Sequence, residues 1–315
     1  MSSIRAVVVD PNVPGRLALR EVASPVPSPS EALVRVSAIS LNLGEVRRAT
    51  TVAEAGWRPG WDFAGIVEQA AADGSGPRNG ARVVGMFSEG AWAEVVAAPT
   101  NTLGRVHEGV TFAQAATLPV AGLTALRALE KGGLLLNKKV LITGASGGVG
   151  HFACQLAHHA GAYVVGAVRR QERVQAVQEL GADRVVVGED LSKAREHGPY
   201  DLILESVGGK SLSDALSMLA QDSVCVNFGV SSGNEITFDA RQFFATGGAS
   251  LYGFILFHEL THRPAGSDLT KLTQMIANGH LHPQIEVEES WTKIADVAQQ
   301  LVNRRITGKA VLRVS

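Results

Sequence analysis

The sequence predicts an α/β protein in which a doubly wound parallel sheet is joined to a second, β-rich domain. From Val140 to about Phe254, short apolar strands alternate with helical stretches, and a glycine-rich turn follows the first strand. Residues 1 to about 110 contain apolar segments separated by turn residues instead. Regular alternation of strands and helices is typical of a parallel sheet with helices on both faces.

Composition limits the functional classes. The chain has 315 residues, with 45% hydrophobic and 19% charged residues, as in a soluble enzyme of two domains. A net charge of −1 offers no basic field for nucleic acid, and no apolar run has the length of a membrane span. The apolar stretch at the N-terminus is too short for a signal peptide. The two cysteines, Cys154 and Cys225, are expected to be buried, and a cytoplasmic location follows.

The first part of the chain is expected to form strands, and its helical character begins at Thr111. Thr111 and Gln114 form a capping box, and Pro119 interrupts the helical pattern between residues 111 and 129. The expected strands of this part cover residues 4–9, 32–39, 64–70, 81–87 and 91–97.

In the middle part of the chain strands alternate with helices, and the last part has two helices and a strand. Strands are expected at 140–143, 163–168, 183–187, 200–205, 223–228 and 249–254, helices at 268–278 and 291–303, and a last strand at 309–314.

The glycine-rich turn has the spacing of a dinucleotide-binding turn. The pattern is Ala145-x-Gly147-x-x-Gly150, with alanine at the first glycine of G-x-G-x-x-G. Such a turn lets backbone N–H groups and a helix N-terminus approach a pyrophosphate. An ordinary strand-to-helix turn is the alternative. The expected cofactor contacts are Ala145, Ser146, Gly147, Gly148, Val149 and Gly150.

The second strand of this region ends in basic residues. Arg169 and Arg170 stand where an NAD site usually has an acidic residue for the ribose, and Arg173 follows one turn later. Guanidinium groups bind a 2′-phosphate in a bidentate manner, which predicts NADP(H). The alternative is a solvated basic helix start.

The motifs together resemble the medium-chain dehydrogenase/reductase superfamily, in its zinc-independent quinone oxidoreductase branch. They occur in the family order over nearly the full length: residues 41–45, 59–65, 116–125, 143–150, 205–209 and 308–312. The resemblance implies a GroES-like catalytic domain, residues 1–113 and 258–315, interrupted by a Rossmann NADP(H)-binding domain, residues 114–257. Active sites of this family lie in the cleft between the two domains.

The resemblance also implies an activity and further site residues. Hydride would pass from NADPH to a quinone or an α,β-unsaturated carbonyl without a metal. Asn42 and Thr124 are the candidate catalytic residues, with a turn-capping asparagine and helix packing as the alternatives. The remaining cofactor candidates are Val207, Phe228, Gly229, Gly253, Phe254 and Lys309. Ordinary strand-end packing is the alternative for Phe228, Gly229, Gly253 and Phe254, and a solvated strand start is the alternative for Lys309, which is the weaker candidate. No proton donor is identified, because Tyr252 lies in an apolar strand and Asp62 occupies a structural position of the family.

Metal sites are not expected. Gly60-Trp61-Asp62 stands where zinc-dependent relatives have Gly-His-Glu, and the three ligands of a catalytic zinc are missing. His258-Glu-Leu-Thr-His262 matches the metalloprotease motif, but Pro264 should end that helix just where a protease helix continues.

Two other functions and one assembly stay open. An enoyl-thioester reductase would use a basic entrance such as Arg47-Arg48, and an NADP(H)-binding sensor or accessory protein would show little turnover. The apolar run at residues 249–257 should form an edge strand that pairs with its copy in a homodimer. Alternatively, residues 258–268 cover this edge within one subunit.

Overall fold

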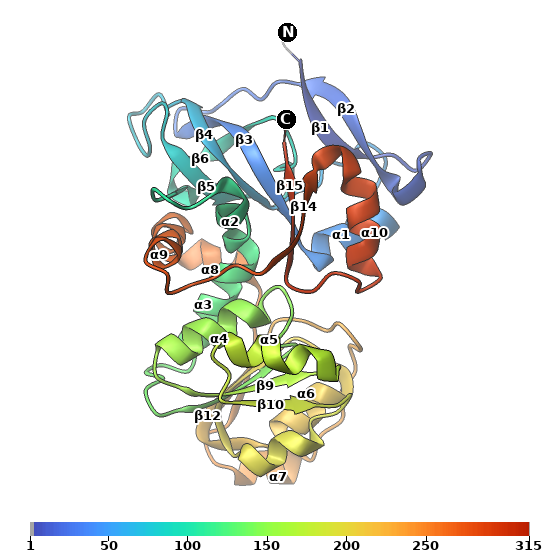
Figure 1. Ribbon diagram of the computed structural model, residues 1–315, viewed down its shortest axis with the longest axis vertical. Helices are drawn as coiled ribbons and strands as arrows, with labels where there is room; N and C mark the ends of the chain where they lie inside the picture. Colours follow the sequence, from blue (N-terminus) through green and yellow to red (C-terminus); the bar gives the residue numbers. More distant parts are fainter. Residues whose placement is uncertain (1–2, 315) are drawn as a thin grey trace. The chain divides into compact units, whose positions relative to one another are not determined.

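The computed structural model describes residues 3–314 and divides into two compact units (Figure 1). The first unit contains the chain up to Leu123 together with the segment from Leu260 onward, and the second is Thr124–Glu259. The first is β-rich, and the second alternates strands and helices. The predicted fold class, a doubly wound parallel sheet with a second, β-rich domain, is confirmed.

The sheet of the first unit brings the last strand of the chain beside the third. Strand β3 is long enough to pair with β6 along its first half and with β15 at its end, where Leu41 faces Ala310. The strand order is β14 (Ile285–Ser290), β15 (Lys309–Arg313), β3 (Glu31–Leu41), β4 (Asp62–Gln69), β5 (Arg82–Met86) and β7 (Gly104–Arg105), with β6 (Val95–Pro99) on β3. Strands β1 (Ser3–Val9) and β2 (Leu17–Ala23) form a separate pair.

Several strands differ from the expectation. Residues 91–94 lie outside β6, so the expected strand at 91–97 begins later, at Val95. Strands β2 and β14 were not predicted. Both carry charged residues between their apolar ones, because one face of each is exposed, and this hides the apolar run.

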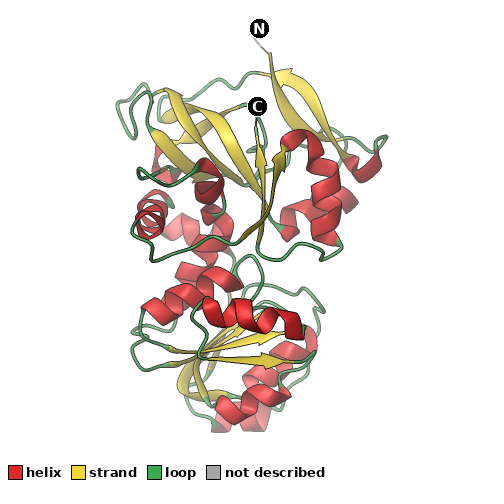
Figure 2. Cartoon of the chain, in the orientation of Figure 1, coloured by secondary structure: helices red, strands yellow, loops and turns green. Residues whose placement is uncertain are grey.

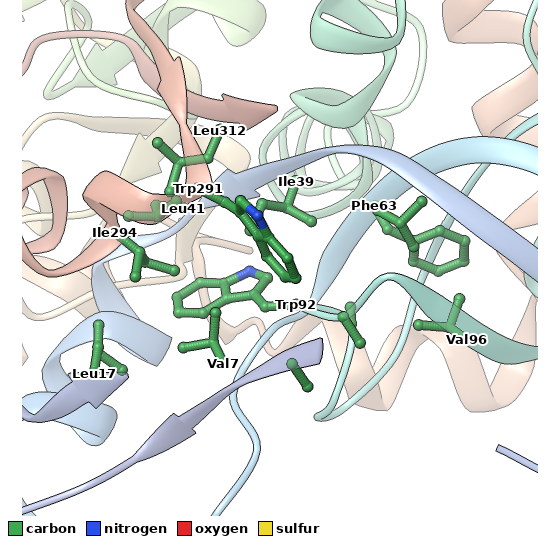
Figure 3. Packing of buried hydrophobic residues seen from close by; sticks show 14 of the residues in the cluster. Val7, Leu17, Ile39, Leu41, Phe63, Trp92, Val96, Trp291, Ile294 and Leu312 are labelled. Carbon is green, nitrogen blue, oxygen red and sulfur yellow. The ribbon is translucent and has the colours of Figure 1, made fainter. Parts of the chain in front are cut away.

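Helices close the core of this unit. They include α1 (Leu43–Thr51), α9 (Gly266–Ala277) and α10 (Ile294–Val302), the last preceded by a short 3₁₀ turn, Trp291–Lys293. Trp92, Trp291 and Phe63 are fully buried in the apolar core (Figure 3). Burying such side chains contributes roughly 1.5–3 kcal/mol each.

The predicted helix start and interruption near residue 119 are confirmed. Helix α2 (Phe112–Ala116) begins with a capping box in which Thr111 Oγ1 accepts the N–H of Gln114 at 3.1 Å. At Pro119 the helix widens into a π-turn, Leu118–Gly122, before α3 (Leu123–Glu130). The π-turn leaves the N–H of Val120 for a side chain, Asp62.

The second unit is a doubly wound sheet of six parallel strands. Their order is β10 (Arg184–Val187), β9 (Tyr163–Val168), β8 (Lys139–Thr143), β11 (Tyr200–Glu205), β12 (Leu219–Asn227) and β13 (Ser250–Gly253). Helices α4 (Gly150–His159), α5 (Val174–Glu179), α6 (Gly209–Leu216) and α7 (Ala240–Ala245) connect them. Helices lie on both faces of this sheet (Figure 2).

Strand β13 lies at the edge of the sheet, as predicted. It is shorter than the apolar run from residue 249 to 257 suggested, because the chain leaves the strand at Phe254 and enters α8 (Leu256–His262). Phe254 is therefore buried within the subunit, whereas Leu251 and Ile255 are 42% and 65% exposed. Within residues 3–314, no helix has both the length and the apolar character needed to cross a membrane.

Candidate functional site

The glycine-rich turn after β8 is tightly closed. A Cβ atom on Gly150 would lie 2.2 Å from the carbonyl oxygen of Gly144, so no larger residue fits there. Gly144 itself has φ +60°, in the left-handed region that favours glycine. On Gly147, a Cβ would meet only the Gly144 oxygen, at 3.1 Å, and otherwise open space. The turn is therefore closed on its inner side and open to a ligand at Gly147.

The same turn presents free backbone donors. Of the described residues, none accepts a hydrogen bond from the N–H groups of Gly148, Val149 or Gly150. These groups stand at the N-terminus of α4, where the helix dipole adds partial positive charge. Such an arrangement can bind a phosphate or pyrophosphate without a positively charged side chain.

Arginine residues follow the neighbouring strand at the same edge of the sheet. Strands β8 and β9 are parallel, so their carboxyl ends lie together. Arg169 and Arg170 come directly after β9 and are exposed, and Arg173 is partly exposed in the following 3₁₀ turn. Arg170 makes an ion pair with Glu172 at 3.6 Å, in which both side chains are more than half exposed. The guanidinium groups remain accessible to an anion.

Glu205, at the end of β11, is a hydrogen-bond centre that the sequence analysis placed in a motif but did not name as a site residue. Its side chain is fully buried and accepts hydrogen bonds from the N–H groups of Val207 and Gly208 at 3.0 and 2.9 Å. It also accepts from the side chains of Ser211, Asn227 and Thr143, at 2.9, 3.0 and 3.3 Å. Glu205 thus fixes the carboxyl ends of β8, β11 and β12 against one another.

The other predicted cofactor positions lie at this edge too. The Val207 carbonyl accepts the N–H of Ser232 at 2.8 Å, and Phe228 donates its N–H to the Glu205 carbonyl at 2.9 Å. Gly229 packs so closely on Ser206 that a Cβ would lie 2.8 Å from its carbonyl oxygen. Gly253 and Phe254 end the edge strand, and a Cβ on Gly253 would meet open space. Predicted positions far apart in the sequence are thereby brought to one edge.

A buried polar cluster lies at the end of β3 in the first unit. Asn42 directly precedes α1 at its N-cap, and its Nδ2 donates to Glu45 Oε1 at 2.9 Å and to Asp62 Oδ2 at 2.8 Å. Its Oδ1 accepts from the ammonium of Lys309 at 2.5 Å. Lys309 also donates to the Leu41 carbonyl at 3.1 Å and lies 3.8 Å from Asp62 Oδ2.

The members of this cluster are held by different elements. The strand pairing of β15 with β3 brings Lys309 to Asn42, and β4 begins with Asp62. Asp62 Oδ1 accepts the N–H of Val120 from the π-turn at 3.1 Å. Lys309 is 2% exposed, so it is not a solvated strand start. Asn42 occupies a helix-capping position and belongs to the cluster at the same time.

Burial shifts the pKa values of the ionisable groups in the cluster. It raises the pKa of Asp62 to about 6, against the effect of the Lys309 charge. Burial also raises the pKa of Glu45 well above its ordinary value, and the charge of Asp62 adds to this. The pKa of Lys309 is lowered, again mainly by burial.

Sequence analysis missed the two carboxyl groups as members of this site. Glu45 stands three residues after Asn42, the spacing of a capping box, and this was an available signal. Asp62 gave no such signal, because only the pairing of β3 with β4 brings it to Asn42. Thr124, the other predicted catalytic residue, lies in α3 with 5% of its surface exposed.

The residues here do not form a zinc ligand set. The Lys309 ammonium sits between Asn42 and Asp62, where it would repel a cation. Across residues 3–314, no group of three or more His, Cys, Asp or Glu side chains is arranged to hold a metal ion. Helix α8, which carries the His258–His262 motif, ends at His262, as Pro264 predicted.

Comparisons with known proteins agree with this architecture. The family model of the alcohol dehydrogenase GroES-like domain matches residues 28–126, and that of the zinc-binding dehydrogenase matches residues 148–277. The quinone oxidoreductase of Pongo abelii is 28% identical over 305 residues, which cover 93% of this chain and 92% of that protein. The chain belongs to the medium-chain dehydrogenase/reductase superfamily. The resemblance of the motifs to the quinone oxidoreductases of this superfamily is confirmed.

Solved structures give the same result. A mycobacterial quinone oxidoreductase is 25% identical, with a TM-score of 0.88 and coverage of 99% of this chain and 100% of the other. The quinone oxidoreductase of Escherichia coli, complexed with NADPH, shares the fold at 22% identity, with a TM-score of 0.87 and coverage of 98% and 99%. A 2-methylene-furan-3-one reductase of Solanum lycopersicum is 28% identical over 311 residues, covering 92% of this chain and 74% of that protein.

Proposed function

We propose that this oxidoreductase uses NADPH to reduce a quinone or an α,β-unsaturated carbonyl without a metal. The observation that carries the proposal is one edge of the Rossmann sheet. There, free N–H groups at the start of α4 stand beside the exposed Arg169 and Arg170, with no acidic residue at those positions. The quinone and furanone reductases among the relatives support the acceptor class.

Different residues at this edge bind different parts of the cofactor. The N–H groups of Gly148, Val149 and Gly150 bind the pyrophosphate, and the arginines bind the 2′-phosphate. The backbones at Val207, Phe228–Gly229 and Gly253–Phe254 line the rest of the edge. When bound, NADPH supplies the hydride from its dihydronicotinamide ring.

Asn42 and Thr124 are proposed to hold the nicotinamide ribose or the substrate. Both amide hydrogens of Asn42 are already used by Glu45 and Asp62, so its Oδ1 and the adjoining backbone offer the remaining contacts. The Lys309 ammonium is fully engaged and acts through Asn42. Conjugation in the acceptor spreads the charge that the hydride delivers, so no metal is required.

Steady-state kinetics on an acceptor panel tests the proposal. We expect turnover of 1,4-benzoquinone or an α,β-unsaturated ketone with NADPH, and much weaker use of NADH. Equal or better use of NADH would refute the role of the arginines. Tight NADPH binding without turnover of any acceptor would favour a sensor or accessory protein.

A second acceptor class has an observation in its favour. The chain is 33% identical over 205 residues to part of a mycocerosic acid synthase-like polyketide synthase of Mycobacterium tuberculosis, covering 62% of this chain and 10% of that protein. An enoyl thioester, the second acceptor that the motifs left open, therefore belongs in the acceptor panel. A kcat/KM higher for crotonyl-CoA than for every quinone would assign this class instead.

We also propose a cytoplasmic homodimer built on β13. On one side this strand pairs with no other strand of the described residues. Leu251 within it and Ile255 just after it are exposed. An open apolar edge is an aggregation hazard that pairing with a second copy removes. Cys154 and Cys225 are buried free thiols, which suits a reducing compartment.

A further inference from the structure

The buried cluster around Asn42 has an unequal number of positive and negative groups. Glu45 and Asp62 are each fully buried, and Lys309 is 2% exposed. With every group ionised, the cluster would carry a net negative charge in the protein interior. Burying an uncompensated charge is costly, so one carboxyl group retains its proton. The geometry decides which of the two it is.

Asp62 has the surroundings of an ionised carboxylate. Its Oδ1 accepts the N–H of Val120 at 3.1 Å, and its Oδ2 accepts from Asn42 Nδ2 at 2.8 Å. The ammonium of Lys309 lies 3.8 Å from Oδ2. Both oxygens therefore have a donor, and the positive charge stands beside one of them.

Glu45 has the surroundings of a neutral acid. Its Oε1 accepts the N–H of Asn42 and one hydrogen of Asn42 Nδ2, both at 2.9 Å, as a carbonyl oxygen does. Its Oε2 is buried and takes no hydrogen bond from any described residue. A carboxylate oxygen without a donor is far less stable in the interior than a hydroxyl group.

We propose that Glu45 is a positioning residue that works as a neutral carboxylic acid and holds the Asn42 amide in one orientation. With Glu45 and Asp62 as acceptors of its two hydrogens, Asn42 must turn Oδ1 toward Lys309. Without Glu45 the amide loses one acceptor and is held only by its contacts with Asp62 and Lys309. The direction of the Glu45 pKa, raised by burial and by Asp62, is consistent with this. The effect on catalysis rests on the proposed function, whereas the protonation state does not.

Two substitutions at one position test the proposal. Glutamine has the shape and charge of the neutral acid, with an amide nitrogen in place of the hydroxyl, whereas alanine removes both. We expect Glu45→Ala to lower kcat/KM by about tenfold, the effect of losing hydrogen bonds of about 1.4 kcal/mol. The kcat/KM of Glu45→Gln should lie within about threefold of the wild-type value, at pH 6 and at pH 9 alike.

Asp62→Asn is the matched control in the same cluster. It removes the carboxyl group that titrates next to Lys309, so we expect a midpoint of thermal unfolding that differs from that of the wild type and varies less with pH, whereas Glu45→Gln should keep the wild-type midpoint. If Glu45→Gln were as damaging as Glu45→Ala, Glu45 would be an ionised counter-charge and the proposal would be wrong. If Glu45→Ala kept the wild-type kcat/KM, Glu45 would not position Asn42.

Infrared spectroscopy reads the protonation state without any turnover. The wild type at pH 8 should show the C=O stretch of a buried protonated carboxyl group, and Glu45→Gln should lack that band. Absence of this band in the wild type would overturn the proposal that Glu45 is protonated. Should no acceptor be reduced, the proposed function fails while this readout and the unfolding midpoints still decide the state of Glu45.

Discussion

The hydroxyl group of Tyr252 donates a hydrogen bond to Glu259 at 2.5 Å, linking the edge strand β13 to α8. Lys131 completes the group, since its ammonium lies 3.1 Å from the Tyr252 oxygen and 2.9 Å from Glu259 Oε2. The ammonium also lies 4.4 Å from the centre of the Tyr252 ring. The glutamate of the apparent metalloprotease motif thus belongs to a structural ion pair, and Tyr252 does more than pack in an apolar strand.

Removing this hydroxyl should destabilise the second unit. Tyr252→Phe leaves Glu259 Oε1 without its donor, and we expect the free energy of unfolding to fall by about 1–2 kcal/mol. Denaturant unfolding measures it. Tyr163→Phe in β9 is the control, because no described residue receives a hydrogen bond from that hydroxyl. Equal stability of the two variants would show that the contact with Glu259 contributes nothing.

Glu205 should be indispensable for the cofactor edge. Glu205→Ala removes an acceptor that five buried or partly buried donors share. We expect the free energy of unfolding to fall by at least about 3 kcal/mol, together with weaker NADPH binding. Asp201→Asn, at the opposite end of β11, is the control. Its side chain is 30% exposed and bonds to Lys138, so a smaller loss is expected. A loss no larger than that of the control would contradict the central role of Glu205.

The arginines after β9 should select the cofactor. Changing both Arg169 and Arg170 to alanine should raise the KM for NADPH about tenfold or more, since a hydrogen bond to a charged group contributes about 1.5–3 kcal/mol. The KM for NADH should stay the same, because NADH has no 2′-phosphate. Arg184→Ala, in the neighbouring strand β10, controls for the loss of positive charge. Equal changes in the KM for NADPH and for NADH would show that the arginines do not bind the 2′-phosphate.

Asp62 should make stability depend on pH. Its pKa is raised from 3.8 to about 6 in the folded protein, so the folded state keeps a proton that the unfolded state has already released. The free energy of unfolding should therefore fall as the pH rises from about 4 to about 6, by roughly 3 kcal/mol for a shift of this size. The measurement is best made in Glu45→Gln, in which Glu45 no longer titrates. We compare the free energy of unfolding of the single variant Glu45→Gln with that of the double variant Glu45→Gln, Asp62→Asn. The difference between the two should vary with pH over this window, and a constant difference would refute the shift in the pKa of Asp62.

The exposed edge of β13 should govern assembly. We expect a dimer in light scattering at micromolar concentration, and a monomer after Leu251→Lys with Ile255→Lys. These positions are exposed in the subunit, whereas Phe254 is buried and its substitution would damage the fold itself. Leu134→Lys is the control, since Leu134 is 79% exposed on the loop before β8. A wild-type mass near 33 kDa would exclude the dimer.

Local patterns in the sequence determined much of this protein. The alternation of apolar runs and helical stretches predicted the doubly wound sheet, because parallel strands are buried on both faces and must be joined by helices. Thr111 and Gln114 predicted a helix start, and Pro119 and Pro264 predicted where helices break or end, since these effects act within one turn. The spacing from Ala145 to Gly150 predicted the tight glycine-rich turn before α4 for the same reason.

Only the tertiary structure decided which distant residues meet. Asp62 and Lys309 join Asn42 because β4 and β15 both pair with β3, and Glu205 accepts from the side chains of two neighbouring strands, β8 and β12. Strand pairing between segments more than 200 residues apart depends on the whole core, which no local pattern encodes. The same packing buries Glu45 with one oxygen unpartnered. The proton that the acid retains is therefore set by the tertiary structure and not by the residue type.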